Sequence, residues 1–144
     1  MRVVFGKPET DGIEVTVLGR SHPGSTDFWD GNWVRTAVAA KVGGFTANFV
    51  VDLRTDEFRS FHAELKSLYT TLGGVATFET MEGCVTLNLS GDGMGHVALD
   101  ADLMDTPGIG NHLRCSLSLD QTYLPAIMDS LDELDTRWPV LGEP

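Results

Sequence analysis

Cysteine is scarce in this sequence, and a long hydrophobic run is absent. The two cysteines, Cys84 and Cys115, lie far apart, with no CxxC pair and no histidine at ligand spacing. No disulfide framework is therefore predicted, although a single Cys84–Cys115 bridge stays an alternative if their strands are neighbours. No apolar run approaches the ~20 residues of a membrane helix, and the segment Met1 to Pro8 turns polar too early for a secretory signal. We expect a cytoplasmic protein without membrane contact.

Basic residues are scarce in the second half of the chain. Residues 79–144 hold 2 Lys or Arg against 12 Asp or Glu, whereas residues 1–78 hold 8 against 9. The net charge of −11 argues against nucleic acid and anionic membranes as direct ligands, because both repel an acidic surface. The acidic half is either a plain solvated face or a surface that meets a basic protein partner quickly.

Catalytic motifs are also missing. The chain has no GxSxG, no Walker loop, no HExxH and no nucleotide-binding glycine fingerprint. His96 and His112 both begin predicted strands after glycine-bearing loops, so an enzyme would require them to converge with Asp92 or Asp105 at one sheet end. The segment 91–95 offers one carboxylate and no lysine, which is typical of a hairpin turn and not of a calcium or phosphate loop. We expect no enzyme, no cofactor and no metal.

Alternation of apolar and polar residues predicts strands over most of the chain. Gly43-Gly44 predicts a hairpin between two long strands. On the return strand, odd-numbered residues from Phe45 to Leu53 are apolar and face inward, whereas Thr46, Asn48, Asp52 and Arg54 face outward. The predicted strands cover residues 2–5, 13–18, 33–42, 45–54, 75–81, 84–90, 96–104 and 112–119.

Two amphipathic helices complete the prediction. Thr55 is the expected N-cap of the first, which ends at Gly73-Gly74, and residues 20–31 before the hairpin are expected to be a loop. The second begins near Asp120 or Thr122 and is closed by Trp138-Pro139. The expected fold is α+β: one twisted antiparallel sheet of about seven to eight strands, with both helices on one face. We expect a single domain over residues 1–144, without an internal repeat.

The densest aromatic segment is Asp27-Phe28-Trp29-Asp30-Gly31-Asn32-Trp33, immediately before the first long strand. Its Asp-Gly-Asn core favours a tight turn, and the flanking indoles can cover one edge of a core. We interpret Asp27, Trp29, Asp30 and Trp33 as a structural motif in which the two indoles anchor the loop to the sheet edge. A direct binding role is the alternative.

This segment and several later turns resemble the WapI-type immunity proteins, a bacterial family of small acidic partners of wall-associated contact toxins. The likeness spans about residue 27 to the C-terminus. It implies a non-enzymatic immunity protein that binds and neutralises a cognate toxin domain. The further matching segments are Gly43-Gly44-Phe45, Met81-Glu82-Gly83, Gly91-Asp92-Gly93-Met94-Gly95-His96-Val97, Pro107-Gly108-Ile109-Gly110-Asn111 and Leu119-Asp120-Gln121-Thr122-Tyr123-Leu124-Pro125.

The carboxylates of the final helix are the first candidate for partner binding. They cluster on its polar side, with only Arg137 to offset them, and acids in the last turns oppose the helix dipole. Such a surface fits a basic toxin domain, for instance a nuclease, because carboxylates compete with phosphate by charge alone. An extended negative surface would add acids from the strand 96–104 and the loop after it. The candidate residues are Asp100, Asp102, Asp105, Asp129, Asp132, Glu133 and Asp135.

A second hypothesis is a cytosolic interaction or assembly module of another kind. It would form a homodimer through the outward face of the sheet, parts of which are small and apolar. The residues that suggest this face are Ala37, Ala39, Val50 and Ala98.

Overall fold

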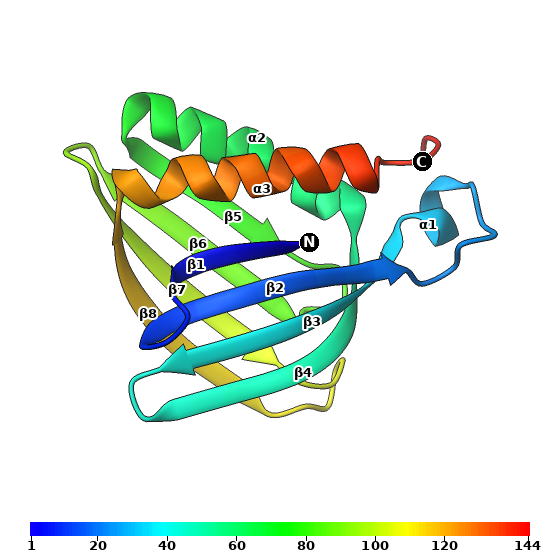
Figure 1. Ribbon diagram of the computed structural model, residues 1–144, viewed down its shortest axis with the longest axis horizontal. Helices are drawn as coiled ribbons and strands as arrows, with labels where there is room; N and C mark the ends of the chain where they lie inside the picture. The colour runs from blue at the N-terminus through cyan, green and yellow to red at the C-terminus, as the bar shows by residue number, and fades with distance from the viewer.

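The computed structural model describes residues 1–144 and passes twice through the same order of elements, four strands followed by a helix (Figure 1). The first series is β1 (Arg2–Lys7), β2 (Asp11–Arg20), α1 (Phe28–Gly31), β3 (Trp33–Val42), β4 (Phe45–Arg54) and α2 (Thr55–Thr71), where α1 is a single short turn inserted before β3. The second series is β5 (Gly73–Glu79), β6 (Val85–Asp92), β7 (His96–Met104), β8 (His112–Asp120), the 3-10 turn η1 (Gln121–Tyr123) and α3 (Leu124–Arg137).

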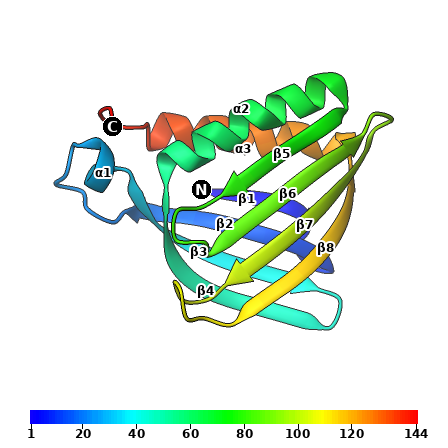
Figure 2. The same cartoon turned by 180° about the vertical axis from the view of Figure 1, so that it is seen from behind.

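The strands form two four-stranded antiparallel sheets. The first sheet has the order β1-β2-β3-β4 and the second sheet the order β5-β6-β7-β8. Figures 1 and 2 show the sheets crossing one another, with α2 and α3 lying together over their open side. The α+β class and the antiparallel pairing are confirmed, but the prediction of one continuous sheet was wrong. The helix α2 carries the chain away from the end of β4, so β5 starts a new sheet and does not pair with β4.

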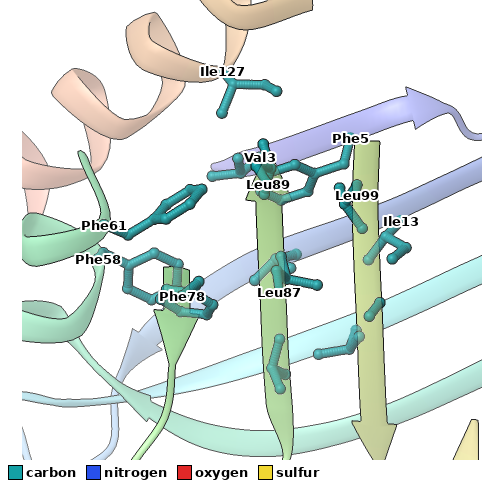
Figure 3. Packing of buried hydrophobic residues seen from close by; sticks show 14 of the residues in the cluster. Val3, Phe5, Ile13, Phe58, Phe61, Phe78, Leu87, Leu89, Leu99 and Ile127 are labelled. Carbon is teal, nitrogen blue, oxygen red and sulfur yellow. The ribbon is translucent and has the colours of Figure 1, made fainter. Parts of the chain in front are cut away.

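One hydrophobic cluster fills the space between the sheets and beneath the helices. It contains 31 buried residues drawn from both sheets, α2 and α3. Aromatic rings join α2 to both sheets, since Phe61 lies 6.1 Å from Phe5 of β1 and 5.6 Å from Phe78 of β5, between ring centroids (Figure 3). Ile127 of α3 closes the same cluster from above. Because both halves contribute, the core depends on the whole series of elements.

Several predicted boundaries need correction. The loop 20–31 contains the turn α1, and Arg54, not Thr55, is the N-cap of α2. The Thr55 hydroxyl instead donates a hydrogen bond to Asn32 Oδ1 at 3.0 Å. The helix ends at Thr71, its C-cap Leu72 has a left-handed φ of 60°, and Gly73 already belongs to β5. None of the helices combines the length and apolar character that crossing a membrane requires.

Candidate functional site

The aromatic segment before β3 folds around a buried cation, Arg54. Trp33 and Arg54 are register partners at the end of the first sheet, and α1 folds over that end. The guanidinium carbon lies 5.0 Å from the ring centroid of Phe28, 5.7 Å from that of Trp29 and 5.1 Å from that of Trp33. Arg54 is therefore enclosed by three aromatic rings, an arrangement that favours a desolvated cation.

Hydrogen bonds complete the enclosure of Arg54. Its two terminal nitrogens donate to the carbonyl oxygens of Trp29 and Phe28, both at 2.7 Å. Its Nε donates to Asp56 Oδ1 at 3.0 Å. The side chain is 1% exposed, although Arg54 lies on the face of β4 that the alternation predicts to point outward. The alternation rule gives the face correctly, but it does not show that α1 covers this face at the end of the strand.

Asn32 and Arg20 tie the same region to the C-terminal segment. The buried Asn32 amide donates to the carbonyl oxygens of Phe28 and Leu141, both at 2.9 Å, and accepts from the Leu141 N–H at 2.8 Å. Arg20 donates to the Gly31 and Pro139 carbonyl oxygens. We call Arg20, Asn32, Arg54 and the rings around Arg54 the arginine cluster. It contacts β2, α1, β3, α2 and the tail after α3, which is the pattern of a structural anchor.

The predicted structural motif contributes to this cluster unequally. Asp27 is the N-cap of α1 and accepts from the Asp30 N–H at 3.0 Å, whereas the Asp30 side chain is exposed. Trp33 is half-buried against Arg54, and Trp29 remains 55% exposed. Arg54 and Asn32 were missed as members. The sequence did contain a signal for this cluster. Three aromatic rings before β3 had no predicted packing partner, and the predicted neighbouring strand ends at an arginine.

Glu57 links the two halves of the molecule. One carboxylate oxygen accepts from the Arg54 N–H at 3.0 Å, and the other accepts from the Met81 N–H in the turn after β5. Burial raises the pKa of the Glu57 carboxyl group to about 7. This effect outweighs that of the two backbone hydrogen bonds, which lower the pKa. A carboxyl group at this position titrates close to neutral pH.

The acidic residues of α3 point to solvent. Asp129, Asp132, Glu133 and Asp135 are all exposed. Among these acids, only Asp132 has a titratable basic neighbour within the chain, His62 of α2, at 3.5 Å between Oδ1 and Nε2. His62 is buried and its Nε2 has no hydrogen-bond partner. Burial, with a smaller effect of Lys66, lowers its pKa despite Asp132 and Asp135, so the imidazole is mainly neutral near pH 7 and offsets little of this charge.

The acids of β7 lie in a different environment. Asp100 accepts from the Ser116 hydroxyl at 2.6 Å, and Asp102 contacts His112 at 2.8 Å and Arg114 at 3.4 Å. These contacts hold both carboxylates on the outward face of the second sheet. Figure 2 shows this sheet in front and α3 behind it. The structure therefore separates Asp100 and Asp102 from the acids of α3.

Asp105 has a local role in the loop between β7 and β8. Its Oδ1 accepts from the Asn111 N–H at 2.8 Å, which closes the loop.

The four small apolar residues of the predicted dimer face are divided between the two sheets. Ala37, Ala39 and Val50 lie on the first sheet, whereas Ala98 lies in β7 of the second sheet.

The histidines do not converge. In the antiparallel register of β7 and β8, His96 faces Asp120 and His112 faces Met104, so the two lie at opposite ends of the strand pair. Asp92 stays beside His96, where it accepts backbone hydrogen bonds from Met94 and His96 that lower its pKa. No three His, Cys, Asp or Glu side chains are grouped so that they could hold a metal ion. Cys84 and Cys115 are both free thiols.

Comparison with known proteins gives one family match. The model of the family described as "Immunity protein WapI-like family" matches residues 4–139. The comparison with curated proteins finds no match. Among solved structures, one described as "Crystal structures of trypanosoma bruciei MRP1/MRP2" is similar, with a TM-score of 0.47 and 12% identity over 93% of this chain and 81% of that chain. A likeness of that degree carries no argument about function.

Proposed function

Because the chain belongs to the WapI-like immunity protein family, we propose that it is a non-enzymatic immunity protein that binds a cognate toxin domain and blocks it. The match over residues 4–139 is the observation that carries this proposal, since it covers all three helices and both sheets except the first two residues of β1. The partner is then a protein. Inhibition by occlusion requires an exposed surface and a rigid scaffold behind it, not a catalytic set.

We place the main contact on the outer face of α3. Asp129, Glu133 and Asp135 are exposed and make no ion pair within the chain. Arg137, the only basic residue of this helix, stacks on Trp138 at 4.8 Å from the ring centroid. The face therefore keeps its negative charge, which supports a basic partner and fast association. A toxin domain that acts on nucleic acid would have such a basic surface, because it must attract phosphate.

The second sheet is a weaker candidate for the same contact. Asp102 is already opposed by His112 and Arg114, and Asp100 is held by Ser116. These partners reduce the charge that the face offers, so we expect Asp100 and Asp102 to contribute less than the acids of α3. Asp105, which closes its own loop, is expected to contribute least.

The test is a triple variant of α3, Asp129→Asn, Glu133→Gln and Asp135→Asn. Asp132 is left unchanged because it faces His62. The ligand is the purified C-terminal domain of the protein encoded by the adjacent open reading frame, and affinity is measured by titration calorimetry at several salt concentrations. Removal of three charges should weaken binding about 10-fold or more at low salt, and should flatten its salt dependence.

A matched control removes the same charge elsewhere. Glu9, Glu82 and Glu143 are exposed acids outside α3 without ion pairs, and their change to Gln should leave affinity within about 3-fold. Equal losses in both triple variants would show that net charge, and not the α3 face, governs binding. A wild-type protein that neither binds the adjacent toxin domain nor protects cells against it would contradict the immunity role itself.

A further inference from the structure

The four sheet edges of the molecule are protected unequally. In Figures 1 and 2, α3 lies along β1 and α2 along β5, so helices cover one edge of each sheet. The remaining edges are β8, which carries His112 and Arg114, and β4. Folded proteins usually protect an exposed edge with charged residues, proline, a bulge or a covering element, because its unpaired backbone groups can bind another strand.

The edge of β4 lacks these protections over residues 45–51, and the charged residues of the strand, Asp52 and Arg54, lie at its end. It is 10 residues long, and residues 45–51 contain no proline and no charged side chain. Its pairing with β3 runs without a register shift from Phe45 to Arg54. Bulges in the first sheet are confined to the pairing of β2 with β3. Over residues 45–51 the free side of β4 is therefore a regular template for strand addition, without charged side chains.

A groove follows this edge. It has a volume of about 310 Å³ and lies between residues 45–49 of β4 and the β7–β8 end of the second sheet. Phe45 at its rim is 68% exposed, and Phe49 is only half-buried. Leu103 and Leu113 line the opposite wall together with Asp105, so the groove itself holds one carboxylate. An added strand would cover aromatic surface that the monomer leaves in contact with water.

Charge identifies the occupant as a second copy of this chain. A protein of net charge −11 repels its own copies wherever carboxylates meet, but residues 31–51 contain no Asp or Glu and carry Arg35 and Lys41. Along the β3–β4 hairpin, Lys41 lies near the turn, and Asp52 lies near the opposite end, where Arg35 pairs with it at 3.7 Å. Antiparallel pairing of two such edges brings the Lys41 end of one copy to the Arg35–Asp52 end of the other, and no two carboxylates meet along residues 31–51.

We propose that two copies pair antiparallel through β4, about a two-fold axis at Asn48, and so form a continuous eight-stranded sheet. In this register Phe45 faces Val51 of the partner subunit, and Ala47 faces Phe49 of the partner subunit. Large side chains thus meet smaller ones on the groove side, and both Asn48 side chains meet on the outer side. The interface is separate from the outer face of α3, so it does not depend on the immunity role.

Asn48 gives a direct test, because a residue on a two-fold axis meets itself. Its side chain is exposed and makes no hydrogen bond within the chain, so substitution should leave the fold intact. Sedimentation velocity on the full chain should show a concentration-dependent dimer for the wild type. Asn48→Asp and Asn48→Lys should each weaken self-association about 10-fold or more, since each places like charges opposite one another. An equimolar mixture of the two variants should restore a dimer.

The control is Ser118, an exposed outward residue of the other free edge, β8. Ser118→Asp and Ser118→Lys should leave the dimer unchanged, and circular dichroism should show that all four variants are folded. A wild type that stays monomeric at about 100 μM would overturn the proposal. So would Asn48 variants that associate as tightly as the wild type, or a mixture of them that does not recover the wild-type affinity.

Discussion

The two halves of the molecule share one order of elements but place their charge differently. The first half, residues 1–72, is nearly neutral and buries one cation, Arg54, within three aromatic rings. The second half carries almost the whole negative charge, and its acids lie on the surface. The same topology thus supports an internal anchor in one half and an exposed charged surface in the other. We expect substitutions in the first half to change stability, and those in the second to change binding.

The largest effect is expected for Arg54→Met. The change removes the cation from its rings and leaves buried carbonyl oxygens of Phe28 and Trp29 with fewer donors. The free energy of unfolding should fall by about 3–5 kcal/mol, measured by guanidinium chloride denaturation. Arg59→Met, at an exposed position of α2, is the control and should cost less than about 0.5 kcal/mol. A loss below about 1 kcal/mol for Arg54→Met would show that the arginine cluster does not anchor the fold.

An intermediate effect is expected from pH, through the residue that joins the halves. The pKa of Glu57 is raised to about 7 in the folded protein, so folding favours its protonated form. Its stabilising contribution is complete below the unfolded pKa of 4.5 and is lost as pH rises through about 7. Because the carboxyl group keeps some contact with water, we expect a loss of only about 1–2 kcal/mol between about pH 5 and pH 8.

Glu57→Gln provides the comparison for this pH dependence. The amide that replaces the carboxyl group would not titrate, so the unfolding free energy of the variant should lack the decline between about pH 5 and pH 8. His62 acts in the opposite direction. Its lowered pKa gives a contribution that is present above about pH 6.5 and lost as pH falls. Parallel pH profiles of wild type and Glu57→Gln would show that another group is responsible.

The smallest effect on stability is expected for the triple variant of α3. Asp135 lies in the last turn of α3, where an acid opposes the helix dipole, and Asp129 and Glu133 are exposed and unpaired, so Asp129→Asn, Glu133→Gln and Asp135→Asn should leave the unfolding free energy unchanged or raise it by up to about 1 kcal/mol. Thermal and denaturant unfolding would measure this directly. A loss greater than about 1 kcal/mol would mean that these acids hold the fold, and the contrast between the halves would fail.

Period-two alternation predicted the strands and the Gly43-Gly44 hairpin well, because inward and outward residues differ clearly in polarity. The division into two sheets could not be predicted from this pattern. After a helix between Arg54 and Gly73, the next strand can rejoin the same sheet or start another. Tertiary packing, which the alternation does not report, determines which of the two forms. The histidines show the same limit, since His96 and His112 both begin strands, yet antiparallel pairing separates them by a full strand length.

Arg54 shows why the site was harder to predict than the fold. Its position in the alternation is that of an outward residue, and an outward arginine is usually solvated. What buries it is a turn 25 residues earlier, whose carbonyl oxygens and rings fit a guanidinium. The acids of α3 were easier to locate, because helical spacing alone brings them to one face.

The arginine cluster also has a consequence for the timing of synthesis. Asn32 hydrogen-bonds Leu141 across 109 residues, and Arg20 reaches Pro139 across 119. At about 5–20 residues per second, the ribosome adds Leu141 roughly 5–20 seconds after Asn32. During that interval the first sheet can form, but Asn32 and Arg20 still lack these carbonyl partners. The anchor of the earliest part of the chain is thus completed by a segment that is translated long afterwards.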